Sequence, residues 1–169
     1  MFETGTYIVC GQHGVCRVES VGKLNLTEAS KDRDYYTLSK VYSQGGVIYV
    51  PADSDKIVMR PVLSREEAEE LIRHITEIEA IRIDNEKRKE DILRQAFKTC
   101  DNREWVRVIK TLRARKQMRL AKGKKVTASD ERFLRTAQEN LYGELAISLN
   151  MDKGDVENYI IEQIGGGDR

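Results

Sequence analysis

The residue pattern changes near residue 62, and this change constrains the fold more than any other feature. Before it, apolar and polar residues alternate in short runs separated by glycines, as in residues 15–21. After it, apolar residues recur at helical spacing, as at Leu141, Leu145 and Leu149. We therefore predict an α+β protein with two domains, residues 1–62 and residues 63–169.

The first domain contains five runs with the composition of β-strands. They are rich in Val, Ile and Tyr, and glycine or proline residues separate several of them. Short strands at fairly even spacing are typical of a small antiparallel β-barrel. Pro51 is expected to end the fourth strand, because proline lacks the N–H that a ladder needs. The five predicted strands are residues 7–10, 15–21, 35–42, 47–50 and 57–60.

The second domain is predicted to be all-helical, with about five helices. Ser64 followed by Glu67 is a capping box, in which each side chain serves a free N–H of the first turn. Asp101, Thr127 and Asp152 precede further helical patterns and can cap them. Another helix is expected from about residue 86 to residue 99. These signals predict a helical bundle.

The most charged part of the second domain is residues 103–125. Ten of these residues are Lys or Arg and Glu104 is the only acid, whereas the whole chain has a net charge of +1. Trp105, Ile109 and Leu112 lie at helical spacing within it, so one face of this helix is predicted to pack on a core. The opposite cationic face suits a phosphate backbone, or is a solvated surface. Trp105 is interpreted as a core residue, the alternative being a wedge for the minor groove.

The sequence gives little support for a catalytic site or a metal site. Cys10, His13 and Cys16 have the spacing C-x2-H-x2-C but lack a fourth ligand, so we interpret the cysteines as buried core residues. His74 is interpreted as a surface residue of an acidic helix. We predict no enzyme, metal, cofactor or small-molecule substrate. Three cysteines, no signal sequence and no long apolar run predict a cytoplasmic protein without a membrane partner.

Residues 144–160 have the spacing of a helix-turn-helix motif. Ala146, Asn150 and Val156 occupy the positions that require a small residue, a turn residue and an apolar residue. However, residues 126–169 contain four basic and nine acidic residues, and phosphates would repel such a recognition helix. We interpret the spacing as packing geometry and keep an independent DNA-binding protein as an alternative.

The strand-rich domain favours protein binding, since it offers tyrosines, valines and an unpaired sheet edge. Several segments of the chain then resemble the CarD/CdnL family of bacterial transcription regulators. These segments are FETGTYIVCGQHGVCRVESV, YYTLSKVYSQGGVIYVPAD, WVRVIKTLRARKQMRLAKGKKVTASDERFL and NLYGELAISL. Together they extend over nearly the full length.

The resemblance implies a Tudor/SH3-like first domain that binds the β-subunit of RNA polymerase. It also implies a helical second domain that contacts promoter DNA, largely independently of sequence, and a non-catalytic effect on open-complex stability. We expect a monomer associated with the nucleoid. The polymerase-binding strand of the family corresponds to Val47, Ile48, Tyr49, Val50 and Pro51. The DNA-facing candidates are Arg88, Lys89, Lys110, Arg113, Lys116 and Arg119.

One position departs from the family pattern. Many members carry a tryptophan wedge for the DNA minor groove at the position that aligns with Glu86 here. A carboxylate cannot insert between bases, and it repels phosphate. The alternative function is therefore a polymerase-bound protein–protein adaptor with weak or no DNA contact.

Overall fold

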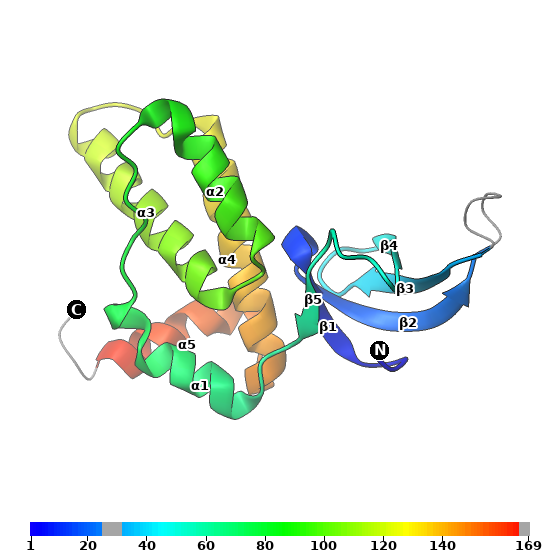
Figure 1. The fold of residues 1–169 in the computed structure, drawn as a ribbon. Coiled ribbons are helices and arrows are strands. Elements are labelled where there is room, and N and C mark those ends of the chain that lie inside the picture. Colours follow the sequence, from blue (N-terminus) through cyan, green and yellow to red (C-terminus); the bar gives the residue numbers. More distant parts are fainter. Residues whose placement is uncertain (25–31, 166–169) are drawn as a thin grey trace. The chain divides into compact units, whose positions relative to one another are not determined.

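The computed structural model describes residues 1–24 and 32–165 and divides into two compact units, Met1–Val62 and Leu63–Arg169 (Figure 1). The first unit contains a five-stranded antiparallel sheet, and five α-helices follow in the second. The predicted α+β class is therefore confirmed.

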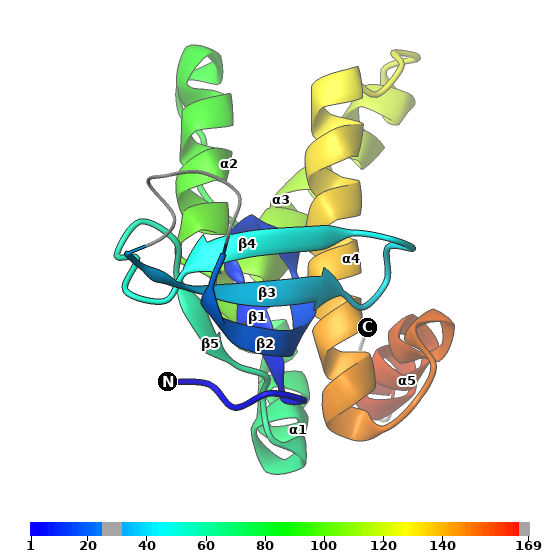
Figure 2. The same cartoon turned by 90° about the vertical axis from the view of Figure 1, so that its right-hand side faces the viewer.

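The sheet of the first unit has the strand order β4-β3-β2-β1-β5, and every neighbouring pair is antiparallel (Figure 2). The sheet is not closed, because β4 and β5 form its two edges. The strands are β1 (Tyr7–Cys10), β2 (Val15–Lys23), β3 (Asp34–Lys40), β4 (Val47–Pro51) and β5 (Met59–Pro61).

Several strand ends differ from the sequence prediction by one or two residues, including the end of β2 at Lys23 rather than at residue 21. β3 ends at Lys40 rather than at residue 42, and β5 starts at Met59 rather than at residue 57. Pro51 belongs to β4 instead of ending it. An edge strand tolerates proline, because the missing N–H can fall on the side that pairs with no other strand.

One face of the sheet carries the core of the first unit. Cys10 and Cys16 are fully buried in it, which confirms their interpretation as core residues. A 3-10 turn joins β1 to β2, and Gly14 follows it with a φ of 76°, a conformation that favours glycine. The other buried members of this core are Ile8, Val18, Tyr36, Leu38 and Val50.

The described part of the second unit contains five α-helices, and three of them, α1, α3 and α4, start at predicted caps. Ser64 and Glu67 form a complete capping box, and the side chains of Asp101 and Thr127 accept backbone N–H groups of the helices that follow them. The second helix begins after a 3-10 turn, Glu86–Arg88, rather than at residue 86. The helices are α1 (Arg65–Arg73), α2 (Lys89–Lys98), α3 (Asn102–Ala121), α4 (Ala128–Leu149) and α5 (Lys153–Gly165).

Helix α4 is the centre of this unit, since α1, α3 and α5 all pack against it, while α2 packs on α3. In Figure 1, α2, α3 and α4 run side by side and α1 and α5 lie at one end of α4. Trp105 is completely buried, with Ile109 and Leu112 beside it on α3, so the predicted core face of this helix is confirmed. Trp105 therefore is not a surface wedge.

A candidate protein-binding edge and a cationic helix

Strand β4 presents two different faces, as its alternating burial shows. Val50 is buried in the core and Ile48 packs against it. Val47 and Tyr49 point the other way and are 47% and 49% exposed. Of the five residues predicted to bind a protein partner, these two offer most apolar side-chain surface to solvent. The exposed half of each side chain stays in contact with water, so it contributes no burial free energy to folding and is available to a partner.

The peptide groups of the same two residues face the open edge of the sheet. The N–H of Lys40 donates to the carbonyl of Gly46 (2.8 Å), and that of Ala52 donates to Asp34 (2.8 Å). Because hydrogen-bonded pairs alternate along an antiparallel ladder, the pairs that contain Val47 and Tyr49 are the non-hydrogen-bonded ones. Their N–H and C=O groups thus point away from β3. Among the described residues, no backbone hydrogen bond at this edge uses them.

A small polar network lies beside this edge on β2 and β3. Glu19 accepts hydrogen bonds from Ser39 Oγ (2.7 Å) and from the Arg17 guanidinium (2.8 Å). These two donors hold the pKa of Glu19 below its ordinary value. The charge of Arg17 is therefore matched within the sheet by that of Glu19.

The DNA-facing candidates of α3 are only partly available to a ligand. Lys110 Nζ donates to the carbonyls of Ile75 and Ile78, both at 2.5 Å, and burial lowers its pKa. Arg113 donates to Tyr142 Oη (3.0 Å) and to Glu157 (2.8 Å). These cations help to hold α3 against its neighbours, so they are partly structural.

Lys89 is the clearest departure from the predicted interface. It is only 8% exposed, and its ammonium group donates to Asp130 at 2.5 Å. Burial would raise the pKa of Asp130, but hydrogen bonds from Lys89 and Arg115 outweigh it and keep this pKa below its ordinary value. Lys89 is thus not a surface cation. It belongs to a buried ion pair between α2 and α4, in which Asp130 neutralises its charge.

Glu86, which the sequence resemblance aligns with the family's tryptophan wedge, is part of the same network. Both of its carboxylate oxygens accept from Arg115, at 2.7 Å and 3.0 Å, and Arg115 Nε also donates to Asp130 at 3.1 Å. The guanidinium lowers the pKa of Glu86. Glu86 therefore helps to tie the start of α2 to α3, which a tryptophan at this position could not do.

The remaining cations cluster around the end of α3. Lys116 is exposed, as is Arg88 in the turn before α2. Arg119 is half-buried and donates to the carbonyl of Lys125 (2.7 Å). The candidate set omitted three exposed lysines, although the absence of acids between residues 105 and 129 could have indicated them. They are Lys122, Lys124 and Lys125.

The helix-turn-helix spacing corresponds to the connection between α4 and α5. Ala146 and Val156 are buried, and Asn150 ends α4 in the left-handed conformation with a φ of 54°. The exposed face of α5 carries Asp155 and Glu157, and Glu157 is paired with Arg113. These features support the interpretation of the motif as packing geometry.

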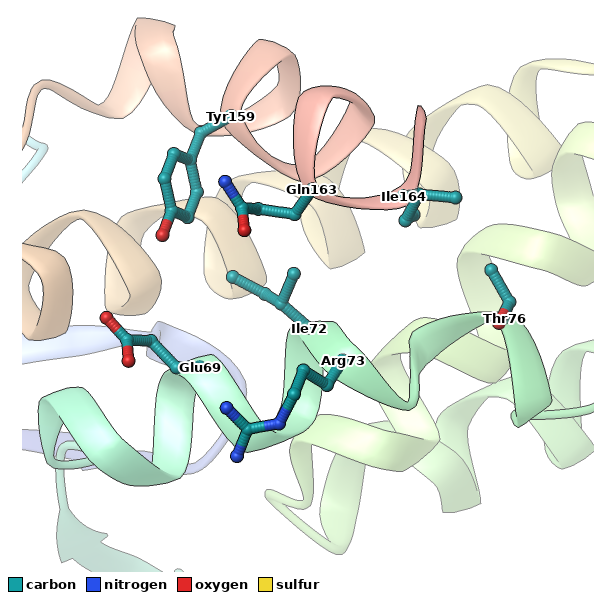
Figure 3. Close-up of a pocket in the computed structure, with 7 residues that line it drawn as sticks. All are labelled: Glu69, Ile72, Arg73, Thr76, Tyr159, Gln163 and Ile164. Atoms are coloured by element: carbon teal, nitrogen blue, oxygen red, sulfur yellow. The ribbon is translucent and has the colours of Figure 1, made fainter. Parts of the chain in front are cut away.

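Two grooves flank α5. The groove between α1 and α5 has a volume of about 510 Å³, and Figure 3 shows Ile72, Tyr159 and Gln163 directed into it. The second groove, of about 360 Å³, lies between α3, α4 and α5 and is lined mainly by aliphatic side chains. No cysteine, serine or histidine lines either groove. Neither groove therefore offers a serine or cysteine nucleophile paired with a histidine base.

The thiol and imidazole groups of the first unit are not arranged as a reactive site. Burial raises the pKa of the Cys16 thiol to about 11, which keeps it protonated. Burial also lowers the pKa of His13, with a smaller effect from Lys40. Within residues 1–24 and 32–165, no three His, Cys, Asp or Glu side chains are grouped closely enough to hold a metal ion. Over the same residues, no helix is long and apolar enough to cross a bilayer.

The first unit is an open antiparallel sheet that exposes side chains and peptide groups at one edge, a geometry to which a partner strand can add. Residues 2–63 match the family model of the CarD-like/TRCF RID domain, an RNA-polymerase-interacting and non-catalytic domain. The first unit is thus a CarD-like domain, as the sequence resemblance indicated. The match ends where the helical unit begins. No curated protein matches the chain.

Proposed function

We propose that the protein is a non-catalytic bacterial transcription regulator that binds the β-subunit of RNA polymerase through β4 of a Tudor-like first domain. The observation that carries this proposal is the edge of β4, where Val47 and Tyr49 expose both their side chains and their peptide groups. A partner strand can add to this edge through main-chain hydrogen bonds, while the two side chains supply specificity. The CarD-like family match supports the choice of RNA polymerase as partner.

The docking proposal is tested with a matched pair of substitutions. Tyr49→Glu places a charge on the edge of β4, whereas Val58→Glu places one at a residue of the same unit that is 44% exposed and outside β4. Capture of core RNA polymerase should fall at least tenfold for Tyr49→Glu and stay near the wild-type level for Val58→Glu. Equal capture by both variants would contradict the docking strand.

The helical unit is also proposed to contact promoter DNA near the melted region and to change the lifetime of the open complex. Arg88, Arg119 and the exposed lysines from Lys116 to Lys125 are the proposed contacts, with Arg113 at the margin. Their support is the excess of solvated cations around the end of α3. Phosphate contacts by such side chains are largely independent of DNA sequence.

The DNA contact is tested by its salt dependence. Replacing Lys122, Lys124 and Lys125 by alanine should lower the slope of log affinity against log salt by roughly one for each phosphate that no longer pairs with a lysine. Open-complex lifetime measured with the same variant then links the DNA contact to transcription. An unchanged slope would remove these lysines from the proposed interface.

The alternative is a polymerase-bound adaptor with weak or no DNA contact. It is favoured by one specific observation: Glu86, in place of the family's wedge, forms a two-bond ion pair with Arg115. An adaptor predicts polymerase capture without any salt-sensitive contribution from DNA. The same salt-dependence experiment therefore decides between the two functions.

A further inference from the structure

The exposed face of the sheet continues from β4 to β1 in a single row. Val47 lies opposite Ser39, Ser39 opposite Arg17, and Arg17 opposite Tyr7. Directly paired residues of neighbouring strands point to the same face. Because strands lie about 4.8 Å apart, the row extends for about 14 Å from the edge of the sheet.

The far end of this row carries a second exposed pair, in which both residues are aromatic. Tyr7 and Tyr42 are 40% and 42% exposed. The N–H of Val41 donates to the carbonyl of Val15 (3.2 Å), which holds the chain next to Tyr42 beside β2. Burial, followed by the nearby Tyr7, raises the pKa of Tyr42, as expected for two neighbouring phenols. The surface therefore has two apolar ends, Val47 with Tyr49 and Tyr7 with Tyr42.

The centre of the row determines which partner suits it. Arg17 is paired with Glu19, so the centre has no net charge to attract a phosphate backbone. Tyrosine and arginine are the residue types enriched at protein–protein interfaces and at their energetic hot spots. The composition of this face thus fits a folded protein partner rather than DNA.

We propose that Tyr7 and Tyr42 form a second contact for RNA polymerase, so that the polymerase covers the sheet face with a folded element in addition to the strand that pairs with β4. This inference rests on the proposed docking function. A strand added to β4 lies about 5 Å beyond the sheet, hence about 19 Å from Tyr7, which no side chain of that strand can span. A second segment of the same partner is therefore required to reach the tyrosine pair.

The test measures the affinity of the full-length protein for core RNA polymerase. The double variant Tyr7→Ser plus Tyr42→Ser should bind about tenfold more weakly, and Tyr7→Phe plus Tyr42→Phe should recover most of that affinity because the rings remain. Tyr42→Glu is a second variant whose residue lies outside the strands, so it tests the contact without changing the ladder. Tyr159→Ser, in the helical unit, is the control and should bind like wild type.

The outcomes separate this inference from the docking proposal. If Tyr49→Glu weakens binding but the Tyr7 and Tyr42 variants bind like wild type, the partner uses the edge alone and the second contact is wrong. If Tyr49→Glu has no effect either, the docking function itself fails. If sedimentation shows a dimer that the tyrosine variants dissociate while polymerase binding is unchanged, the face binds a second copy and the inference is overturned.

Discussion

Strand β4 and helix α3 present their surface side chains in different ways. On β4, Val47 and Tyr49 are about half exposed, and their peptide groups face an open sheet edge. On α3, Lys110 and Arg113 already donate hydrogen bonds within the helical unit. The strand thus leaves these side chains and peptide groups exposed, whereas part of the charge of the helix is used in hydrogen bonds that hold it against its neighbours. An excess of charge in a sequence is therefore weaker support for an interface than exposed apolar residues on a sheet edge.

The largest expected effect concerns aromatic residues, one in each region. Trp105→Ala should lower the free energy of unfolding by about 3–5 kcal/mol, because a completely buried ring leaves a cavity. Tyr49→Ala should change it by less than about 0.5 kcal/mol, because half of that side chain is already solvated. Urea unfolding followed by far-UV circular dichroism measures both. Similar decreases for the two variants would contradict the view that Trp105 is a core residue and that Tyr49 contributes little to folding.

The division of the charges on α3 between folding and binding could hardly be predicted from the sequence. Caps such as Ser64 and Asp101 could be predicted, because they depend on residues close in the chain. The apolar face with Trp105 could also be predicted from its spacing. The partners of Lys89 and Arg115 could not, since Asp130 is distant in the sequence and meets them only after α2, α3 and α4 pack. The open sheet likewise depends on long-range pairing that a strand count does not determine.

The buried ion pair provides the next test. Asp130→Ala should lower the free energy of unfolding by about 3 kcal/mol, because it leaves the buried Lys89 without its counter-charge. Glu139→Ala, an exposed acid on the same helix, is the matched control and should cost less than about 0.5 kcal/mol. If the two variants unfold at the same urea concentration, the buried pair of Lys89 and Asp130 does not stabilise the fold.

The salt dependence of DNA binding should distinguish exposed cations from cations that are paired inside the helical unit. Lys116→Met removes an exposed ammonium group and should lower the salt slope of DNA affinity by about one. Lys89→Met removes an ammonium group that Asp130 already neutralises, so the slope should stay unchanged. Fluorescence anisotropy with a duplex over a range of salt concentrations measures both. An equal decrease for Lys89→Met would mean that the buried pair opens when DNA binds.

The smallest effect is the titration of the two histidines, one in each unit. A hydrogen bond and charge from Glu77, with a further contribution from Glu70, raise the pKa of His74, whereas burial lowers that of His13. Since the folded pKa of His74 exceeds its unfolded value, its contribution to stability is complete below about pH 6.5 and is lost as pH rises through the folded pKa. Titration by NMR should give opposite shifts, and Glu77→Gln should reduce that of His74. A His74 pKa at or below the value for an unfolded chain would contradict these ion pairs.

The open edge of β4 is the basis of the proposed docking, and amide hydrogen exchange can test it residue by residue. The protein is exchanged in the presence of core RNA polymerase, released, and read by NMR. The N–H groups of Val47 and Tyr49 should become strongly protected, whereas those of Ile48 and Val50, already paired with β3, should change little. This alternating pattern would support strand addition at β4. Unchanged exchange at Val47 and Tyr49 in a demonstrated complex would contradict it.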